Sequence, residues 1–302
     1  MKKVKIKSSW CSDENILKRL IDQFKTSEDD LKNIEFTLGD DAENVFFFGY
    51  ITEELQPNKK YFVLPQEPYW SGNHQKSFPN SENITLLGYD KSLYNFNGEF
   101  IESVSMMLYG GRGPESEGWE DWVFDKIKNN RPKTKIMSSC VSSLGRNDNE
   151  VPDGCLYKKR INVIENLIEK TDFVDIYSWE ENGKNTKGWL NKKIDGVVDY
   201  KFSLCIENSH EKNYVSEKFY DCILNDTIPI YYGCSNIREI LPENGYFLID
   251  DIDDIDSIIN LLKNINENHD EIYNRMINEC RKIKSRYFNE FNPLKLINNL
   301  CK

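Results

Sequence analysis

The chain has 302 residues, which is long enough for two domains of ordinary size, each with its own hydrophobic core. Its composition, with 39% hydrophobic, 13% aromatic and 29% charged residues, is typical of a globular protein and argues against a disordered or membrane-embedded one. The net charge of −11 argues against nucleic acid as the main partner, because a protein that binds the phosphate backbone needs a basic surface.

The first third of the sequence alternates strands with a helix. Hydrophobic runs predict strands at 4–7, 34–38, 45–50 and 61–64. A helix is expected after Ser12, because apolar residues repeat at helical spacing from Leu17 to Phe24. The prolines on both sides of Glu67 predict an extended loop after the fourth strand. The glycine-rich stretch 109–118 is expected to be a loop as well, because it lacks the lysine and serine of a phosphate-binding loop.

A second domain is predicted to open near Arg131. Strands are expected at 136–141, 173–177, 202–206, 228–232 and 246–249, with a helix at 159–168 between the first two. Strands that alternate with helices in this way indicate a doubly wound parallel sheet. The chain would then divide into 1–130, 131–290 and a C-terminal helix at 291–302, and this last segment is the candidate to return to the first domain.

The cysteines and histidines indicate whether disulfide bonds or a zinc site are to be expected. The eight cysteines show no CxxC spacing and several fall inside predicted strands or helices, so we expect reduced thiols. The three histidines form no H-x-x-x-H pair, which argues against a zinc site. No stretch approaches the roughly 20 apolar residues that span a bilayer, and the first ten residues lack the apolar core of a signal peptide. We therefore expect no transmembrane segment and a cytoplasmic location.

The most informative segment runs from Tyr200 to Gly233. A buried strand ends in a polar turn, a helix capped by Ser216 follows, and a second buried strand closes at Gly233. Ligands in such folds lie beyond the carboxyl ends of the strands, which is where this turn and the start of the helix fall. Lys218, in the first helical turn, would add a cation to backbone N–H groups that already suit an anion such as a diphosphate.

This segment resembles the donor-binding motif of the α-1,3-fucosyltransferases. The matching pieces are IENS, NYVSEK and IPIYYG, in the order and at the spacing of that family. Ile206 stands where the family usually has an aromatic residue, and Ser216 stands where it usually has threonine. The resemblance covers roughly 133–250 and is faint before it.

The resemblance implies an α/β fold of two Rossmann-like domains that face each other across a cleft, the glycosyltransferase B architecture. It implies an inverting, metal-independent enzyme that moves L-fucose from GDP-fucose to a hydroxyl of an oligosaccharide or glycan acceptor, in an α-1,3 linkage. The first domain would hold the acceptor and the second the sugar nucleotide, and no cofactor or obligatory metal is expected. The lack of a predicted transmembrane segment indicates the microbial or viral type, unless the chain is a trimmed Golgi enzyme.

Six residues are predicted to bind the donor by this resemblance: Asn208, Tyr214, Ser216, Glu217, Lys218 and Arg160. Lys218 and Arg160 would neutralise the leaving diphosphate, and Glu217 would contact the ribose or the sugar ring. Lys158 and Lys159 are close enough in sequence to take the place of Arg160. Three of these residues also have a possible structural role. The Glu217 carboxylate would interact favourably with the positive end of the helix dipole, Asn208 would cap the turn, and Tyr214 would pack beneath the helix.

Glu67 is the candidate general base, because the family places a glutamate in a loop after a strand of the first domain. The neighbouring aromatic residues suit a sugar ring and would raise a carboxylate pKa. Asp40 and Asp41 are lesser candidates. The acidic run 250–256 contains D-x-D patterns that bind a metal in other glycosyltransferases, but helix capping and solvation explain it here.

Two other functions stay open. Lysine and arginine bind any diphosphate, so the donor could be a different nucleotide sugar. A non-catalytic protein that binds a sugar nucleotide or a glycan could use the same fold.

Overall fold

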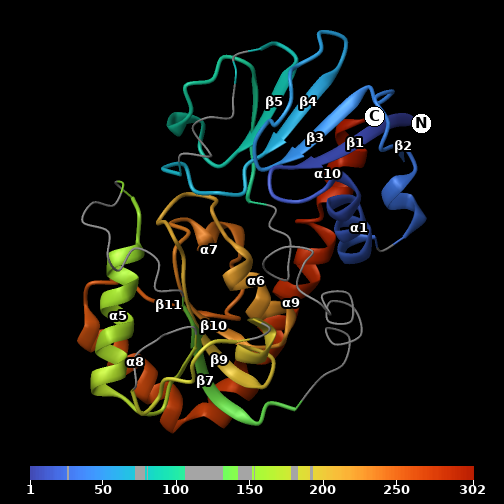
Figure 1. Ribbon diagram of the computed structural model, residues 1–302. Helices are drawn as coiled ribbons and strands as arrows, with labels where there is room; N and C mark the ends of the chain where they lie inside the picture. Colours follow the sequence, from blue (N-terminus) through green and yellow to red (C-terminus); the bar gives the residue numbers. More distant parts are fainter. Residues whose placement is uncertain are drawn as a thin grey trace.

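The computed structural model describes residues 1–25, 27–71, 79, 81–105, 132–141, 152, 154–177, 183–190 and 193–302. Two sheets lie one above the other, the first built from the N-terminal part of the chain and the second from the C-terminal part (Figure 1). Every pairing between the strands of each sheet is parallel. The predicted α/β class with two parallel-sheet regions is therefore confirmed.

The N-terminal sheet has six strands in the order β2-β1-β3-β4-β5-β6. Their bounds are β1 (Lys2–Ser8), β2 (Ile34–Phe36), β3 (Asn44–Phe48), β4 (Lys60–Leu64), β5 (Ile84–Gly88) and β6 (Glu99–Glu102). The first four confirm the predicted strands. Strands β5 and β6 were not predicted, and β6 carries a glutamate at each end and lies at the edge of the sheet, so it lacks the apolar run of a buried strand.

Helix α1 (Asp13–Phe24) follows β1 as predicted, and the Ser12 hydroxyl accepts a hydrogen bond from the Asn15 N–H at 3.3 Å. Its buried apolar face consists of Ile16, Leu20 and Phe24. A 3₁₀-helix, η1 (Glu28–Leu31), leads on to β2, and η2 (Lys91–Leu93) links β5 and β6.

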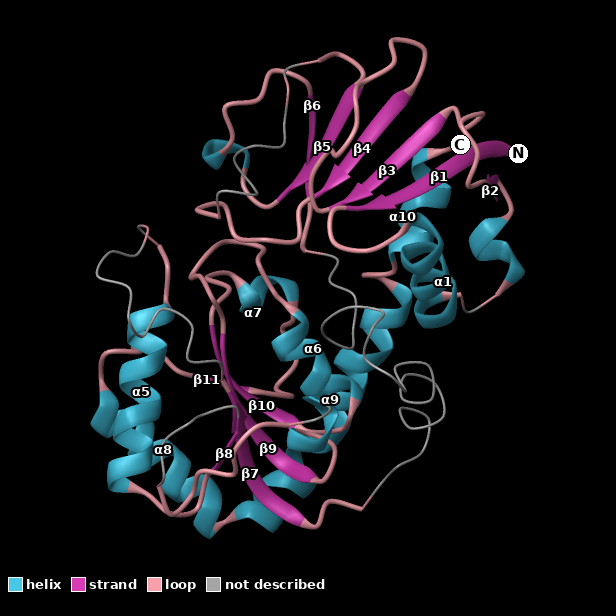
Figure 2. Cartoon of the chain, viewed as in Figure 1, coloured by secondary structure: helices cyan, strands magenta, loops and turns pink. Residues whose placement is uncertain are grey.

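The C-terminal sheet has five strands in the order β11-β10-β9-β7-β8. Their bounds are β7 (Lys135–Cys140), β8 (Asp175–Tyr177), β9 (Tyr200–Ile206), β10 (Ile228–Tyr232) and β11 (Phe247–Leu248). Helix α5 (Tyr157–Lys170) joins β7 to β8, a 3₁₀-helix η3 (Lys193–Gly196) precedes β9, and helix α6 (Glu217–Leu224) joins β9 to β10. Figure 2 shows α5 and α6 on opposite sides of the sheet.

The strand order reverses between β7 and β9. From β7 the chain moves outward to β8, and from β9 it moves in the other direction to β10. Parallel α/β sheets bind their ligands at such a switch point, outside the carboxyl ends of the strands. The loops after β7 and β9 are therefore where a ligand of this sheet is expected.

The later helices are α7 (Ile237–Ile240), α8 (Ile255–Glu267), α9 (His269–Asn289) and α10 (Pro293–Leu300). Helix α10 packs against α1 and η1, and Asn298 Oδ1 accepts the Asn33 N–H at 3.0 Å (Figure 1). The end of the chain thus contacts the region where it begins. The boundaries 1–130, 131–290 and 291–302 themselves stay a prediction.

All eight cysteines lie in the described ranges and all are free, as expected. Among the helices described, none is long and apolar enough to cross a membrane, and a cytoplasmic location stays a prediction. The predicted loop at 109–118 and the domain opening at Arg131 lie outside the described residues.

Candidate functional site

The start of α6 forms the centre of the site, at the carboxyl end of β9. Ser216 caps the helix as predicted: its Oγ accepts the Lys218 N–H at 3.3 Å. The same hydroxyl donates to Glu207 Oε2 at 2.5 Å and accepts from Lys218 Nζ at 3.2 Å. A short hydroxyl side chain at this position therefore connects the strand end, the helix start and the lysine.

Glu207 is the residue that fixes this arrangement, and its side chain is fully buried. Its carboxylate accepts the Ser216 N–H at 2.7 Å and the Tyr231 hydroxyl at 3.3 Å, and Lys218 Nζ lies 3.5 Å away. A buried carboxylate needs such donors, because an unpaired one would be strongly destabilising. Gly233 is required beside it, since a Cβ there would lie 2.3 Å from Glu207 Cγ.

Glu217 and Lys218 belong to a small network of charges. Lys218 Nζ lies 3.7 Å from Glu217 Oε1, and Lys193 Nζ lies 3.2 Å from the same atom and 2.7 Å from Asp221 Oδ2. Burial by itself would raise the pKa of Glu217, but Lys193 and Lys218 outweigh it and hold that pKa well below its usual range. Glu217 is therefore ionised near neutral pH, close to a lysine that remains about one-fifth exposed.

Arg160 lies near the start of α5, on the other side of the sheet from α6, and it contacts the turn 207–213 that follows β9. Its Nη1 donates to Asn208 Oδ1 at 2.6 Å, and its guanidinium lies 4.9 Å from the centre of the Tyr157 ring. Arg160 is 2% exposed, whereas Lys158 and Lys159 are exposed and Lys159 pairs with Asp253 at 2.5 Å. Of these three cations, Arg160 is the buried one, and it donates a hydrogen bond to the turn after β9.

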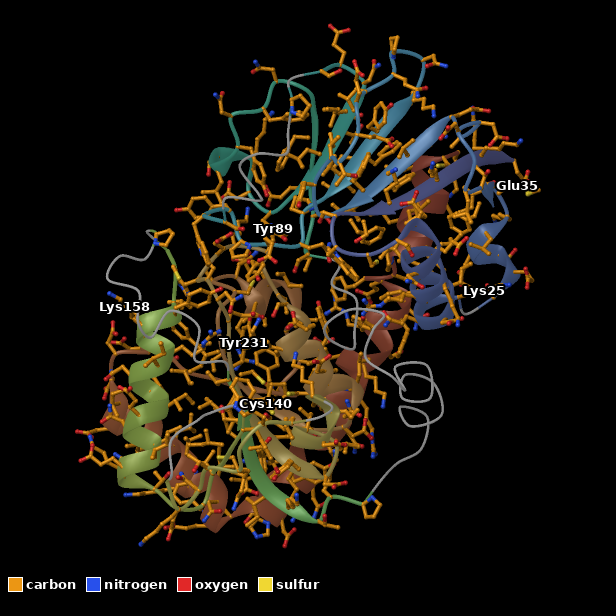
Figure 3. The ribbon with its side chains drawn as sticks, viewed as in Figure 1. Lys25, Glu35, Tyr89, Cys140, Lys158 and Tyr231 are labelled. Atoms are coloured by element: carbon orange, nitrogen blue, oxygen red, sulfur yellow. The ribbon has the colours of Figure 1, made fainter. Side chains whose placement is uncertain are left out.

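Tyr214 is buried at the boundary between the two regions. Its ring packs edge-on against Tyr89, with 5.4 Å between ring centres, and Figure 3 shows Tyr89 at this boundary, above Tyr231. Asn213 next to it adopts a left-handed backbone, φ 60°, and its Nδ2 donates to the Tyr89 carbonyl at 2.6 Å. Tyr214 thus packs against the N-terminal region, where the sequence had left open a role beneath the helix, and contact with a donor stays a prediction.

Glu67 lies in the loop after β4, on the N-terminal side of this boundary. The residue is exposed, yet enough protein surrounds its carboxyl group to raise its pKa, with Lys218 opposing that rise and Glu217 adding to it. These charges place Glu67 within electrostatic reach of the start of α6. Asp40 and Asp41 instead pair with lysines of β1: Asp40 with Lys5 at 3.2 Å, and Asp41 with Lys3.

The acidic run 250–256 serves mainly as a helix start. Asp254 caps α8, accepting the Ser257 N–H at 3.0 Å and its hydroxyl at 2.7 Å, and Asp253 takes part in the ion pair with Lys159. Within the part of the chain that the structure describes, no three His, Cys, Asp or Glu side chains gather so as to hold a metal ion.

The arrangement brings two cations to one sheet edge. Lys218 and Arg160 come from helices on either side of the switch point and meet the same turn, 207–213. The capped helix start adds the positive end of the helix dipole. Two cations at one sheet edge suit an anion such as a diphosphate, and the role of Glu67 as a base stays a prediction.

The family model described as the C-terminal part of glycosyltransferase family 10 (fucosyltransferase) matches residues 130–302, more than half of the chain. The chain belongs to glycosyltransferase family 10. This family-10 match covers the predicted donor-binding segment, and it confirms the resemblance that the motifs indicated.

Two relatives show how the similarity is distributed. A fucosyltransferase-like protein of Arabidopsis thaliana is 27% identical over 150 residues, which are 48% of this chain and 27% of the relative. The α-(1,3)-fucosyltransferase FucT of Helicobacter pylori is 31% identical over 97 residues, 32% of this chain and 20% of FucT. The matched stretches thus span only about a quarter or less of these relatives' own lengths.

Solved structures resemble the whole family-10 chain in fold. An α1,3-fucosyltransferase crystal structure matches 91% of this chain and 80% of its own with a TM-score of 0.51 and 19% identity. The T4 phage β-glucosyltransferase matches 99% of each chain with a TM-score of 0.55 and 9% identity. The predicted glycosyltransferase B architecture is confirmed by these neighbours.

Sequence reasoning missed three parts of this family-10 site. Lys193, which pairs with Glu217, lies 24 residues away from it in sequence and has no motif around it. Glu211 lies in the polar turn but was not singled out, although a second carboxylate beside the motif was a usable signal. The role of Gly233 depends on Glu207 pressing against it, which only the folded arrangement reveals.

Proposed function

We propose that this chain transfers L-fucose from GDP-fucose to a hydroxyl of a glycan acceptor in an α-1,3 linkage, with inversion and without an obligatory metal. Its family membership supports the sugar. The observation that carries the proposal is the hydrogen bond from the Tyr69 N–H, two residues after Glu67, to Glu211 in the family segment, and the charges of Lys218 and Glu217 act on the Glu67 pKa. Glu67 would then serve as the base, with Lys218 and Arg160 as the cations that meet the diphosphate.

The donor would bind along the start of α6. Lys218 and Arg160 would neutralise the diphosphate, and Asn208, which already bonds to Arg160, would hold the guanidinium in place. Ser216 would act through the cap and through its contact with Lys218. Glu217, held ionised by Lys193, would accept hydrogen bonds from the ribose or the sugar ring. GDP as the nucleotide is supported by a solved α1,3-fucosyltransferase with GDP, which has this fold.

Transfer would then be a single displacement. Glu67 takes the proton of the acceptor hydroxyl as its oxygen attacks the anomeric carbon of fucose, and the bond from that carbon to the diphosphate breaks on the opposite face. The raised pKa of Glu67 makes it a better base than an ordinary exposed glutamate. The negative charge that develops on the departing GDP is stabilised by Lys218 and Arg160. Two side-chain cations supply the charge that a metal ion provides in other transferases.

The test joins binding to turnover. Thermal-shift titrations with GDP, GDP-fucose, UDP and dTDP should show stabilisation by the guanine nucleotides, and stabilisation by UDP alone would instead favour a different nucleotide sugar. An acceptor panel with GDP-fucose should yield a fucosylated product. Glu67→Gln should abolish it, whereas Asp41→Asn, at a lesser candidate for the base, should leave it unchanged. Binding of GDP-fucose without hydrolysis or transfer would favour a non-catalytic protein.

A further inference from the structure

The loop that carries Glu67 is tied down at two points. On one side of Glu67, the Tyr89 hydroxyl donates to the Pro65 carbonyl at 2.7 Å, a bond within the N-terminal region. On the other side, the Tyr69 N–H donates to Glu211, at 3.3 Å from Oε1 and 3.2 Å from Oε2. This second bond joins the loop to the turn after β9, in the C-terminal region.

Glu211 is built into its position. It is 5% exposed, and its Oε1 also accepts the hydroxyl of Ser209. Burial raises the pKa of the Glu211 carboxyl, while the bonds from Ser209 and from the Tyr69 N–H oppose that rise. A buried carboxyl group is stable only where donors meet it, so the two groups that approach Glu211 hold it in one orientation.

The turn that holds Glu211 is the same turn that meets the predicted donor site. Asn208, three residues earlier, accepts the bond from Arg160, and Glu207 fixes Ser216 and Lys218. The loop has a second contact with the C-terminal region, because the ring of Trp70 packs edge-on against the ring of Tyr157 in α5. The hydrogen bond to Glu211 thus connects the turn 207–213 directly to the backbone two residues from Glu67.

We propose that Glu211 is a positioning residue that sets the proposed base, Glu67, relative to the sugar nucleotide. The inference rests on the proposed function. Glu211 would not touch the substrate. It would hold the Tyr69 amide so that the carboxylate of Glu67 lies within hydrogen-bond distance of the acceptor hydroxyl, and a misplacement of about 1 Å is enough to slow a reaction up to about a hundredfold.

The experiment compares three variants with wild type by amide hydrogen exchange, GDP affinity and fucose transfer. Glu211→Ala removes the acceptor. Glu211→Gln keeps one oxygen acceptor and guards against a misfolded alanine variant. Lys212→Ala is the matched control, because it breaks another contact between the same turn and the N-terminal region, the 2.5 Å ion pair with Glu102, without touching the loop.

In Glu211→Ala, the exchange of the Tyr69 amide should speed up at least about tenfold, as expected when a hydrogen bond to a charged acceptor is lost. Its kcat for transfer should fall about ten- to a hundredfold while the GDP dissociation constant stays within about twofold. Glu211→Gln should recover part of that kcat and keep the acid limb of its pH profile at the wild-type position. Lys212→Ala should match wild type in all three measurements.

Several results would overturn the proposal. Unchanged exchange at Tyr69 would remove the physical link, and unchanged kcat with faster exchange would leave the bond structural only. Loss of the acid limb in Glu211→Gln would make Glu211 itself the base. A parallel loss of GDP affinity would indicate damage to the donor site. A wild type that binds GDP but transfers no fucose refutes the proposed function and, with it, this role, whereas the other failures leave that function standing.

Discussion

Replacing Gly233 by alanine tests whether Glu207 organises the donor site. A Cβ at this position would lie 2.3 Å from Glu207 Cγ and 2.7 Å from both Glu207 Cβ and the Tyr231 hydroxyl. Ordinary contact begins near 3.4 Å, so Glu207 must move by about 1.1 Å. It is fully buried and bonded to Ser216 at 2.7 Å and 2.5 Å, so it has no empty space to enter without breaking those bonds.

Overpacking of this kind costs about 1–3 kcal/mol, and losing a hydrogen bond to a charged group costs about 1.5–3 kcal/mol. We therefore expect Gly233→Ala to lower the free energy of unfolding by about 2.5–6 kcal/mol in urea denaturation. GDP affinity, measured by calorimetry, should fall as well. Gly39→Ala is the control, since its Cβ would meet the exposed side chain of Asp41 at 3.0 Å. Unchanged stability and GDP affinity in Gly233→Ala would refute the role given to Glu207.

Lys218→Ala should slow transfer at least about tenfold in steady-state assays, because removing one group that stabilises developing charge costs about 3 kcal/mol, and near-normal turnover would refute the role. The pH profile of kcat/KM should show an acid limb above the usual range of glutamate, because burial raises the pKa of Glu67; Glu67→Gln should remove that limb, and a limb that persists would assign the base elsewhere. Lys193→Met should lower the free energy of unfolding by about 1–3 kcal/mol at pH 7 and by less near pH 3. The pKa of Glu217 is lower in the folded chain than in the unfolded chain, where it is about 4.3, so its ionisation stabilises the fold above that pH and does so less and less as the pH falls. If Lys193→Met lost the same free energy of unfolding at both pH values, this coupling between Lys193 and Glu217 would be contradicted. EDTA should leave the rate of transfer unchanged. A strict metal requirement would contradict this expectation and make the acidic run 250–256 the candidate metal site.

Local signals in the sequence were enough to predict the strand, turn and helix start of the segment 200–233. A buried strand, a polar turn, a Ser216 cap and a lysine in the first helical turn are short-range features, and each is present in the structure. Helical periodicity likewise located α1, because a buried stripe leaves a regular trace in the sequence. The order of three short motifs then identified the family.

Contacts between distant parts of the chain could not be predicted. The left-handed Asn213 and its bond to Tyr89, 124 residues away, depend on how the two regions meet. Lys193 reaches Glu217 from a 3₁₀-helix with no motif of its own. The edge strand β6 was not predicted, because its sequence is too short and too polar to be distinguished from a loop.

One measurement tests the central claim most directly: proton NMR of the product formed when the purified chain is incubated with GDP-fucose, EDTA and an acceptor glycan panel. The account predicts one added fucose in an α-1,3 linkage, with the anomeric configuration inverted relative to the donor. A product with retained configuration, or no fucosylated product from a chain that binds GDP-fucose, would contradict it.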